Sequence, residues 1–122
     1  MAIRTLVEAI SHYGRDAYLL TVARDGPHTS HVSIELRDGT IGCALGKSAA
    51  GNIARESHIS LFWPPMEAGG YALIVNGLAT CEQRVTGAMM AEITLTKSVL
   101  HRSGPKSDVN DGLCENDCRR LT

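Results

Sequence analysis

The first apolar residues of the chain recur with the spacing of an amphipathic helix. Within residues 2–13 they stand at positions i, i+3, i+4 and i+7, which brings them to one face of a helix. Gly14 follows them as a helix stop. The four residues are Ile3, Leu6, Val7 and Ile10. The pattern predicts a helix at the start of the chain whose apolar stripe faces a core.

The pattern then changes to the alternation and the short apolar runs of β-strands. Residues 28–36 alternate polar and apolar side chains, which is typical of a half-buried strand, and Asp38-Gly39 supplies hairpin-turn chemistry directly after them. Gly77 interrupts a long apolar run and predicts a bend or bulge. Strands are expected at residues 17–23, 28–36, 41–46, 58–63, 71–83 and 88–96, with a turn-like segment at 97–102.

A short helix is expected between the third and fourth strands. Residues 48–56 have helical spacing, with Ser48 as the N-cap and with Ile53 and Ala54 facing inward. Six strands, one helix before them and one among them predict a mainly β fold. We expect a six-stranded antiparallel barrel that is split around the second helix, because closure avoids exposed sheet edges.

A change in composition marks the end of this expected barrel. Ser, Gly, Pro, Asp and Asn dominate from residue 103 onward, so residues 1–102 are expected to form the barrel domain and 103–122 a loose polar tail. Cys114 and Cys118 in that tail are either two free thiols or a disulfide or part of a metal site. Truncation after Arg102 is expected to leave the barrel intact.

Charge and composition exclude several function classes. Twelve Lys and Arg against thirteen Asp and Glu give a formal net charge of −1, which argues against nucleic acid or an anionic membrane as the partner. No segment has the length of a membrane span and no apolar signal core opens the chain, so a cytoplasmic protein is expected. Cys43 and Cys81 lie in apolar runs, where a buried reduced thiol is the ordinary state.

The segment LGKSAAGN, residues 45–52, suggests a cradle for a phosphate. The N-terminus of a helix offers unpaired N–H groups and a partial positive charge. Gly46 would let a ligand approach the backbone, and Lys47 and Ser48 would add a charge and a hydroxyl, while Ala49 adds no bulk. The alternative is that Ser48 merely caps the helix and Lys47 is a solvated charge, and these residues alone leave both interpretations open.

Several motifs, in this order, resemble the pyridoxamine 5′-phosphate oxidase-like FMN-binding split-barrel superfamily. They are DGPH at 25–28, NIAR at 52–55 before a strand, VNGLA at 75–79 and TLTKSVLHR at 94–102. The resemblance extends from about residue 5 to residue 102. It implies a flavin-binding split barrel that forms a homodimer and holds FMN, or a deazaflavin or haem in some branches, in a groove at the dimer interface.

The resemblance also implies residues for each part of the cofactor. The second strand would run along the edge of the flavin ring, and the loop before the second helix would hold the phosphate, with one asparagine fixing that loop. The implied residues are Ser30, His31, Val32 and Ser33 for the ring, Gly46, Lys47, Ser48 and Ala49 for the phosphate, and Asn52 for the loop.

Other residues that could carry chemistry have simpler interpretations. His28 and His31 stand three apart on one expected strand, so they project to opposite faces and cannot bind one metal ion together. His31 could meet the cofactor, and His101 is either a ligand or a structural histidine. Trp63 belongs to the core or to a dimer interface. No metal site is predicted.

Four hypotheses on function follow. The first is an FMN-dependent oxidoreductase that moves a hydride between a small-molecule substrate and FMN at a dimer interface. The second is a deazaflavin-dependent reductase that uses coenzyme F-420, the third a non-enzymatic flavin or haem carrier, and the fourth a structural dimer without a ligand. The sequence contains no hydrolase elbow motif and no pair of catalytic carboxylates, so no catalytic residue is assigned.

Overall fold

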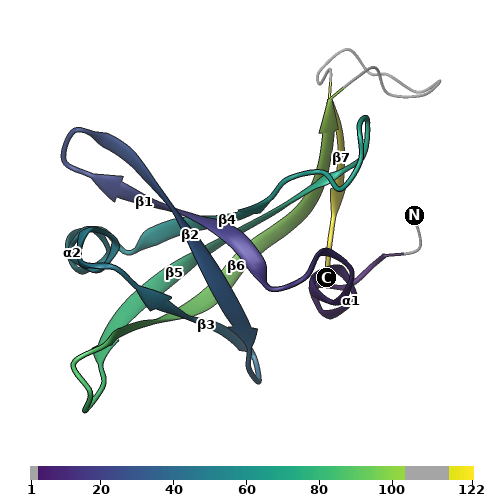
Figure 1. Ribbon diagram of the computed structural model, residues 1–122. Helices are drawn as coiled ribbons and strands as arrows, with labels where there is room; N and C mark the ends of the chain where they lie inside the picture. Colours follow the sequence, from purple (N-terminus) through teal and green to yellow (C-terminus); the bar gives the residue numbers. More distant parts are fainter. Residues whose placement is uncertain (1–2, 104–115) are drawn as a thin grey trace.

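The computed structural model describes residues 3–103 and 116–122 (Figure 1). Two short helices accompany a single sheet of seven strands. In chain order the elements are α1 (Leu6–Tyr13), β1 (Asp16–Ala23), β2 (Gly26–Leu36), β3 (Thr40–Leu45), α2 (Lys47–Arg55), β4 (His58–Trp63), β5 (Ala72–Gln83), β6 (Met89–Ser103) and β7 (Asn116–Arg120).

Strands β1 to β6 form a closed antiparallel barrel. Their order is β3-β2-β1-β4-β5-β6, and pairing of β3 with β6 closes the ring. The 15-residue strand β6 has three partners, since it pairs with β5 along most of its length, with β3 along its first part and with β7 along its last part. The predicted mainly β, six-stranded antiparallel barrel is confirmed.

The core of the barrel is aliphatic. Leu19, Leu61 and Ile93 are fully buried, and each such side chain contributes about 1.5–3 kcal/mol through removal of apolar surface from water. Trp63 is 1% exposed, and its Nε1 donates a hydrogen bond to the Gly14 carbonyl oxygen at 2.9 Å. Trp63 therefore lies in the core, one of the two places expected for it.

Helix α1 begins at Leu6, later than predicted, because Thr5 caps it. The Thr5 Oγ1 accepts a hydrogen bond from the Glu8 backbone N–H at 3.2 Å. Val7 is 63% exposed, so the stripe that faces the core includes Leu6 and Ile10 but not Val7.

Helix α2 differs from the prediction at its start and on one face. Gly46, with extended backbone, is the N-cap in place of Ser48, so the helix begins one residue earlier. Ile53 is buried as predicted, whereas Ala54 is exposed, because it lies about 100° around the helix from Ile53. Among the described residues, neither helix has the length and apolar character needed to cross a membrane.

In strands β5 and β6 the structure confirms one prediction, the bulge, and contradicts another, the turn-like segment. The register of the β5–β6 pair shifts between Asn76 and Gly77, which confirms a bulge at Gly77. A Cβ atom there would stand 2.6 Å from the Thr94 carbonyl oxygen, so glycine is required by this close approach. Residues 97–102, predicted as turn-like, continue β6 instead, because the long strand β5 offers them partners and buries Leu100 completely.

The end of the chain is not loose. Strand β7 pairs with β6, and the buried Leu121 donates its backbone N–H to the Ser98 carbonyl oxygen. Thr122 exchanges backbone hydrogen bonds with the segment around α1, and Figure 1 shows the C-terminus beside that helix. The expectation of a loose tail is therefore wrong for residues 116–122, where backbone pairing outweighs polar composition. Cys114 lies outside the described residues.

Candidate functional site

The two groups of residues expected to hold a cofactor follow the point where β2 and β3 separate. The β2–β3 ladder ends at the pair Ile34–Cys43. Beyond it, residues 30–33 of β2 continue beside β1, whereas β3 leads through Leu45 into α2. Figure 1 shows α2 at this end of the barrel, next to the β1–β2 hairpin. Residues 30–33 and 46–49 therefore both lie just beyond the point at which β2 and β3 part.

The mouth of α2, residues 46–49, is open to solvent. Gly46, Lys47 and Ser48 are exposed, and no side chain of the described residues caps the helix. The first hydrogen bond of the helix runs from Ala50 N–H to the Gly46 carbonyl oxygen at 3.0 Å, which leaves the preceding N–H groups facing outward. Ala49 is 2% exposed, so its side chain belongs to the core. The donor set is backbone N–H groups, one hydroxyl and one ammonium, which fits a phosphate.

Two contacts fasten α2 to the end of β1. Asn52 is buried, and its Nδ2 donates a hydrogen bond to the Oγ1 of the buried Thr21 at 3.1 Å. Arg55 donates from its Nη2 to the Val22 carbonyl oxygen. Asn52 thus holds the helix whose first residues form the mouth.

The four β2 residues expected along the flavin ring divide between two faces of the strand. Ser30 is half-buried and Val32 is 7% exposed, so these two face the interior. His31 and Ser33 are exposed on the other face, where the His31 ring meets Tyr18 edge-on with centroids 5.7 Å apart. A ligand on the outer face can therefore touch the side chains of His31 and Ser33 but not that of Val32.

His28 lies on the other face of β2 from His31. His28 is half-buried, and its Nδ1 finds no hydrogen-bond partner within residues 3–103 and 116–122. Its different exposure from His31 fits the expected projection to opposite faces. In the described part of the chain, no three His, Cys, Asp or Glu side chains are grouped so that they could hold a metal ion.

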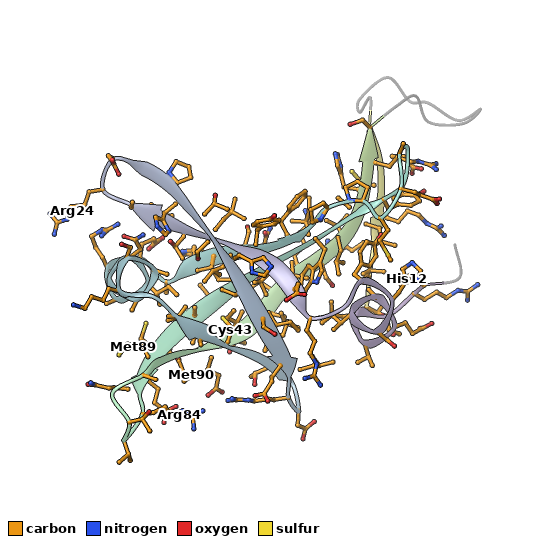
Figure 2. All side chains as sticks on the ribbon, viewed as in Figure 1. His12, Arg24, Cys43, Arg84, Met89 and Met90 are labelled. Carbon is orange, nitrogen blue, oxygen red and sulfur yellow. The ribbon has the colours of Figure 1, made fainter. Side chains whose placement is uncertain are left out.

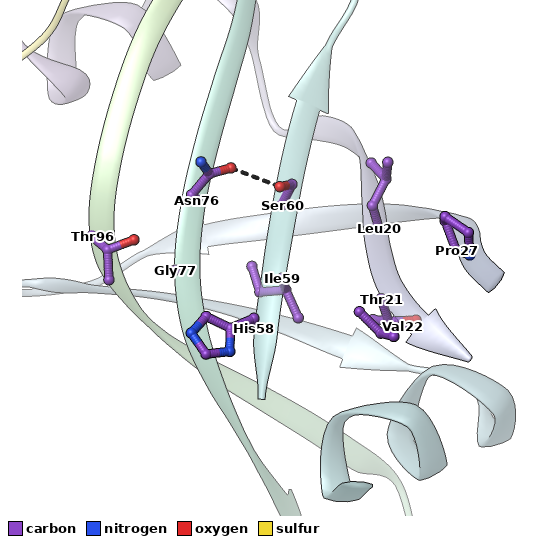
Figure 3. Close-up of a pocket in the computed structure, with 10 residues that line it drawn as sticks. All are labelled: Leu20, Thr21, Val22, Pro27, His58, Ile59, Ser60, Asn76, Gly77 and Thr96. Atoms are coloured by element: carbon purple, nitrogen blue, oxygen red, sulfur yellow. Dashed lines mark hydrogen bonds between the residues drawn. The ribbon is translucent and has the colours of Figure 1, made fainter. Parts of the chain in front are cut away.

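An apolar groove, which was not predicted from the sequence, lies on the outer face of β1, β4 and β5. It consists of two adjoining cavities of about 410 and 530 Å³ that share Leu20 and Ser60. Figure 3 shows Ser60 beside Asn76 on the neighbouring strand, where the Ser60 hydroxyl donates to Asn76 Oδ1 at 2.6 Å. We define the groove by Tyr18, Leu20, Ser60, Phe62, Ile74 and Asn76.

A signal for the groove was present in the sequence. Strand β4 places Ile59, Leu61 and Trp63 in the core, yet Phe62 on its outer face is also apolar. Ile74 on β5 repeats this arrangement. Strands that carry apolar residues on both faces are usually covered on both faces.

Basic side chains stand on the hairpins at the same end of the barrel as α2. Figure 2 shows Arg24 at the tip of the β1–β2 hairpin and Arg84 in the β5–β6 hairpin. Helix α2, which begins with the exposed Lys47, packs against β1, β5 and β6. This end of the barrel therefore presents cations from three segments of the chain.

The thiols near the barrel interior are poor nucleophiles. Burial raises the pKa of Cys43 to about 11, with the nearby Cys81 as a smaller cause. Burial also raises the pKa of Cys81, whose Sγ lies 3.5 Å from the Ala50 carbonyl oxygen. Both thiols stay protonated at neutral pH, and neither is placed to attack a substrate.

A separate polar cluster joins the residue before β5 to β6 and β7. The Tyr71 hydroxyl donates to Asp117 Oδ2 at 2.6 Å, and Arg102 Nη2 donates to the same oxygen at 2.5 Å. The hydrogen bond from Tyr71, aided by Arg102, holds the pKa of Asp117 below its ordinary value. The same hydrogen bond is the main cause that raises the pKa of Tyr71. In the next residue pair of the β6–β7 ladder, His101 Nδ1 lies 3.3 Å from Cys118 Sγ.

Comparison with known proteins gives relatives in sequence and in structure. No family model matches the sequence. Over 117 residues the chain is 32% identical to uncharacterized protein Mb0449c of Mycobacterium bovis, with 84% of this chain and 82% of the relative covered. Uncharacterized protein MT0457 of Mycobacterium tuberculosis matches to the same extent.

Solved structures share the fold at low identity. General stress protein 26 from Bacillus anthracis has a TM-score of 0.65 and 16% identity, over 95% of this chain and 98% of that one. A Clostridium acetobutylicum protein related to general stress protein 26, of the pyridoxinephosphate oxidase family, has a TM-score of 0.67 and 8% identity, over 94% and 92%. These solved structures have the barrel fold that the sequence predicted. The chain therefore has the split-barrel fold of pyridoxamine 5′-phosphate oxidase-like proteins.

Proposed function

We propose that the chain is an FMN-dependent oxidoreductase that acts as a homodimer on a small-molecule substrate. The observation that carries this proposal is the uncapped mouth of α2, which opens where β2 leaves β3. Two solved proteins that share the fold are described as an F-420 reductase and a heme-binding protein, with TM-scores of 0.59 and 0.60. These neighbours support a redox cofactor, and the mouth of α2 favours one with a phosphate.

The residues at the mouth fit the phosphate of FMN. Lys47 would form the charged contact, Ser48 would donate its hydroxyl, and the first N–H groups of α2 would add the positive end of the helix dipole. A charge-assisted hydrogen bond of this kind contributes about 1.5–3 kcal/mol. Asn52 would keep the mouth in place through its hydrogen bond to Thr21.

The flavin ring would lie along the outer edge of β2. His31 and Ser33 point to that side, and the Tyr18 ring already packs against the His31 ring there. When bound, FMN would supply the hydride transfer, and the chain would bind and orient it and exclude water from it. The protonated thiols of Cys43 and Cys81 take no part in this scheme.

A second copy of the chain would cover the groove. Tyr18 is 40% exposed, and Leu20, Phe62 and Ile74 are only half-buried, although all four are large and apolar. Apolar surface of this kind is typical of a protein interface, and a two-fold dimer is the commonest way to bury it. Because the groove adjoins β2, the partner would also close the cofactor site and border the entry of a small substrate.

The cofactor is tested by titration of the purified full-length chain. The absorption spectrum shows whether a flavin, a deazaflavin or a haem accompanies the protein. Added FMN should then lose its fluorescence in a saturable way as it binds. The absence of FMN binding would contradict the proposal, and uptake of F-420 or haem instead would identify the alternative cofactor.

The dimer is tested separately by sedimentation velocity at micromolar concentration. We expect a dimer for the natural chain and a monomer for Tyr18→Glu, which places a charge in the groove. Val7→Glu is the matched control, because Val7 is 63% exposed on α1, outside the groove. A monomeric natural chain that still binds FMN would contradict the proposed dimer while leaving the proposed cofactor in place.

A further inference from the structure

Strand β7 places a thiol against an imidazole at the edge of the sheet. Ala72, His101 and Cys118 stand in one row across β5, β6 and β7, and the Cys118 Sγ lies 3.3 Å from His101 Nδ1. Cys118 is exposed, whereas His101 is half-buried. A thiol that solvent can reach and that contacts an imidazole base has the arrangement of an activated cysteine.

The face of β7 that carries Cys118 also carries a positive charge. Side chains alternate along β7, so Arg120 shares the face of Cys118, whereas Asp117 and Arg119 point to the other face. Asp117 is also occupied there by its bonds to Tyr71 and Arg102. Among the described residues of β7, the face that carries Cys118 therefore holds a cation and no carboxylate.

Space for a small reactant adjoins the pair. His101 is part of the wall of a cavity of about 340 Å³, which Gly69, Gly70 and Phe62 also line. The two glycines add no side chains to their part of the wall. Phe62 lines the groove as well, so the cavity and the groove are neighbours on the same face of the sheet.

We propose that Cys118 is a modification site that forms a mixed disulfide with a low-molecular-weight disulfide, with His101 as the base. The Cys118 S–H gives its proton to Nδ1 of His101, and the thiolate attacks one sulfur of the disulfide. A new S–S bond forms to Cys118 as the old S–S bond breaks. The departing thiolate takes up the proton from His101, so the oxidant is the small disulfide itself. This proposal does not depend on the proposed FMN activity.

The test follows the reaction of the full-length chain with oxidised glutathione, in a Cys114→Ser background that removes the neighbouring thiol. Intact and peptide mass spectrometry identify the modified cysteine and its rate. We expect the adduct on Cys118 before Cys43 or Cys81, and a rate at pH 7 about ten-fold lower in His101→Gln. His12→Gln is the control, because His12 is an exposed histidine on α1, and it should react like the parent.

A second measurement does not depend on the folding of the His101 variant. The parent protein and N-acetylcysteine are compared from pH 6 to pH 9, and Cys118 should retain more of its maximal rate at pH 7 than the free thiol does. Identical pH profiles for Cys118 and N-acetylcysteine would overturn the proposal. A folded His101→Gln variant that reacts as fast as the parent throughout this range would also overturn it.

Discussion

The mouth of α2 and the groove are opposite kinds of surface at neighbouring places. The mouth is made of small and polar residues, with Lys47 and Ser48 exposed and the start of the helix uncapped. The groove is mainly apolar, although polar residues such as the hydrogen-bonded pair Ser60 and Asn76 also line it. One surface suits an anion and the other suits a ring system or another protein.

The two surfaces are built into the barrel in different ways. The mouth depends on α2 and on its attachment to β1 through Asn52. The groove depends on the curvature of β4 and β5, and β5 bends at the Gly77 bulge. Substitutions in the two regions should therefore separate stability, cofactor affinity and association from one another.

The largest effect is expected from Gly77→Ala at the floor of the groove. The added Cβ would stand 2.6 Å from the Thr94 carbonyl oxygen and 2.8 Å from Ile93 Cγ2. Relief of this clash would require the paired backbone of β6 to move. We expect a loss of about 3 kcal/mol in the free energy of unfolding, measured by urea denaturation.

Gly51→Ala is the matched control for that substitution. Gly51 lies in α2, and a Cβ there would meet none of the described atoms within 4 Å. Alanine should therefore stabilise the helix by about 0.5–1 kcal/mol. If Gly77→Ala were as harmless as Gly51→Ala, the bulge would not shape the groove.

The next largest effect is expected from Asn52→Ala beneath the mouth. The substitution leaves the buried Thr21 hydroxyl without its partner, which should cost about 2 kcal/mol in the free energy of unfolding. FMN affinity should fall as well, because α2 loses an attachment, whereas sedimentation should still show a dimer.

A double-mutant cycle with Thr21→Val assigns this effect to the hydrogen bond. The sum of the losses in unfolding free energy of the two single variants should exceed the loss in the double variant. Full additivity would mean that Asn52 acts through packing alone.

Lys47→Ala should lower the affinity for FMN and leave the stability of the fold nearly unchanged. The side chain is exposed, so the unfolding free energy should change by less than about 0.5 kcal/mol, while FMN affinity should fall about ten-fold, or about 1.4 kcal/mol. Ser48→Ala should behave in the same way, because Gly46 and not Ser48 is the N-cap. Fluorescence titration and urea denaturation of the same samples measure both quantities, and unchanged FMN affinity in both variants would exclude the mouth as the phosphate site.

The smallest effect concerns pH and lies away from both regions. Asp117 has a lowered pKa, so its contribution to stability is present above its ordinary value of 3.8 and is lost as the pH falls through its lower folded value. Tyr71 has a raised pKa, so its contribution is present below its ordinary value of 10.0 and is lost as the pH rises through its folded value. In Asp117→Asn the melting temperature should therefore fall less than in the parent as the pH is lowered from 5 to 2. The FMN affinity at pH 7 should not change.

The sequence predicted the barrel better than its ends and surfaces. Strong alternation and the Gly77 interruption located the strands, because burial of one face imposes that pattern. The C-terminal strand could not be predicted, since backbone pairing with β6 holds it and its composition is polar. Truncation after Arg102 is now expected to destabilise the protein, because it removes this strand and the buried Leu121.

Of the candidate site, the sequence indicated the mouth of α2 but not the groove. The residues of the mouth are consecutive, so their chemistry is visible in one short segment. The groove is formed by side chains from three strands that only the fold brings together, and the orientation of Val32 toward the core depended on its register with β1. The attachment of Asn52 to Thr21 likewise joins residues that are distant in the sequence.

The most direct test of the central claim compares the affinities of FMN and riboflavin for the full-length chain. The two ligands share the flavin ring, and only FMN carries the phosphate. We expect FMN to bind about ten to a hundred times more tightly, the ratio that a charge-assisted contact at the mouth of α2 provides. Equal affinities for FMN and riboflavin, or no binding of either, would contradict the account.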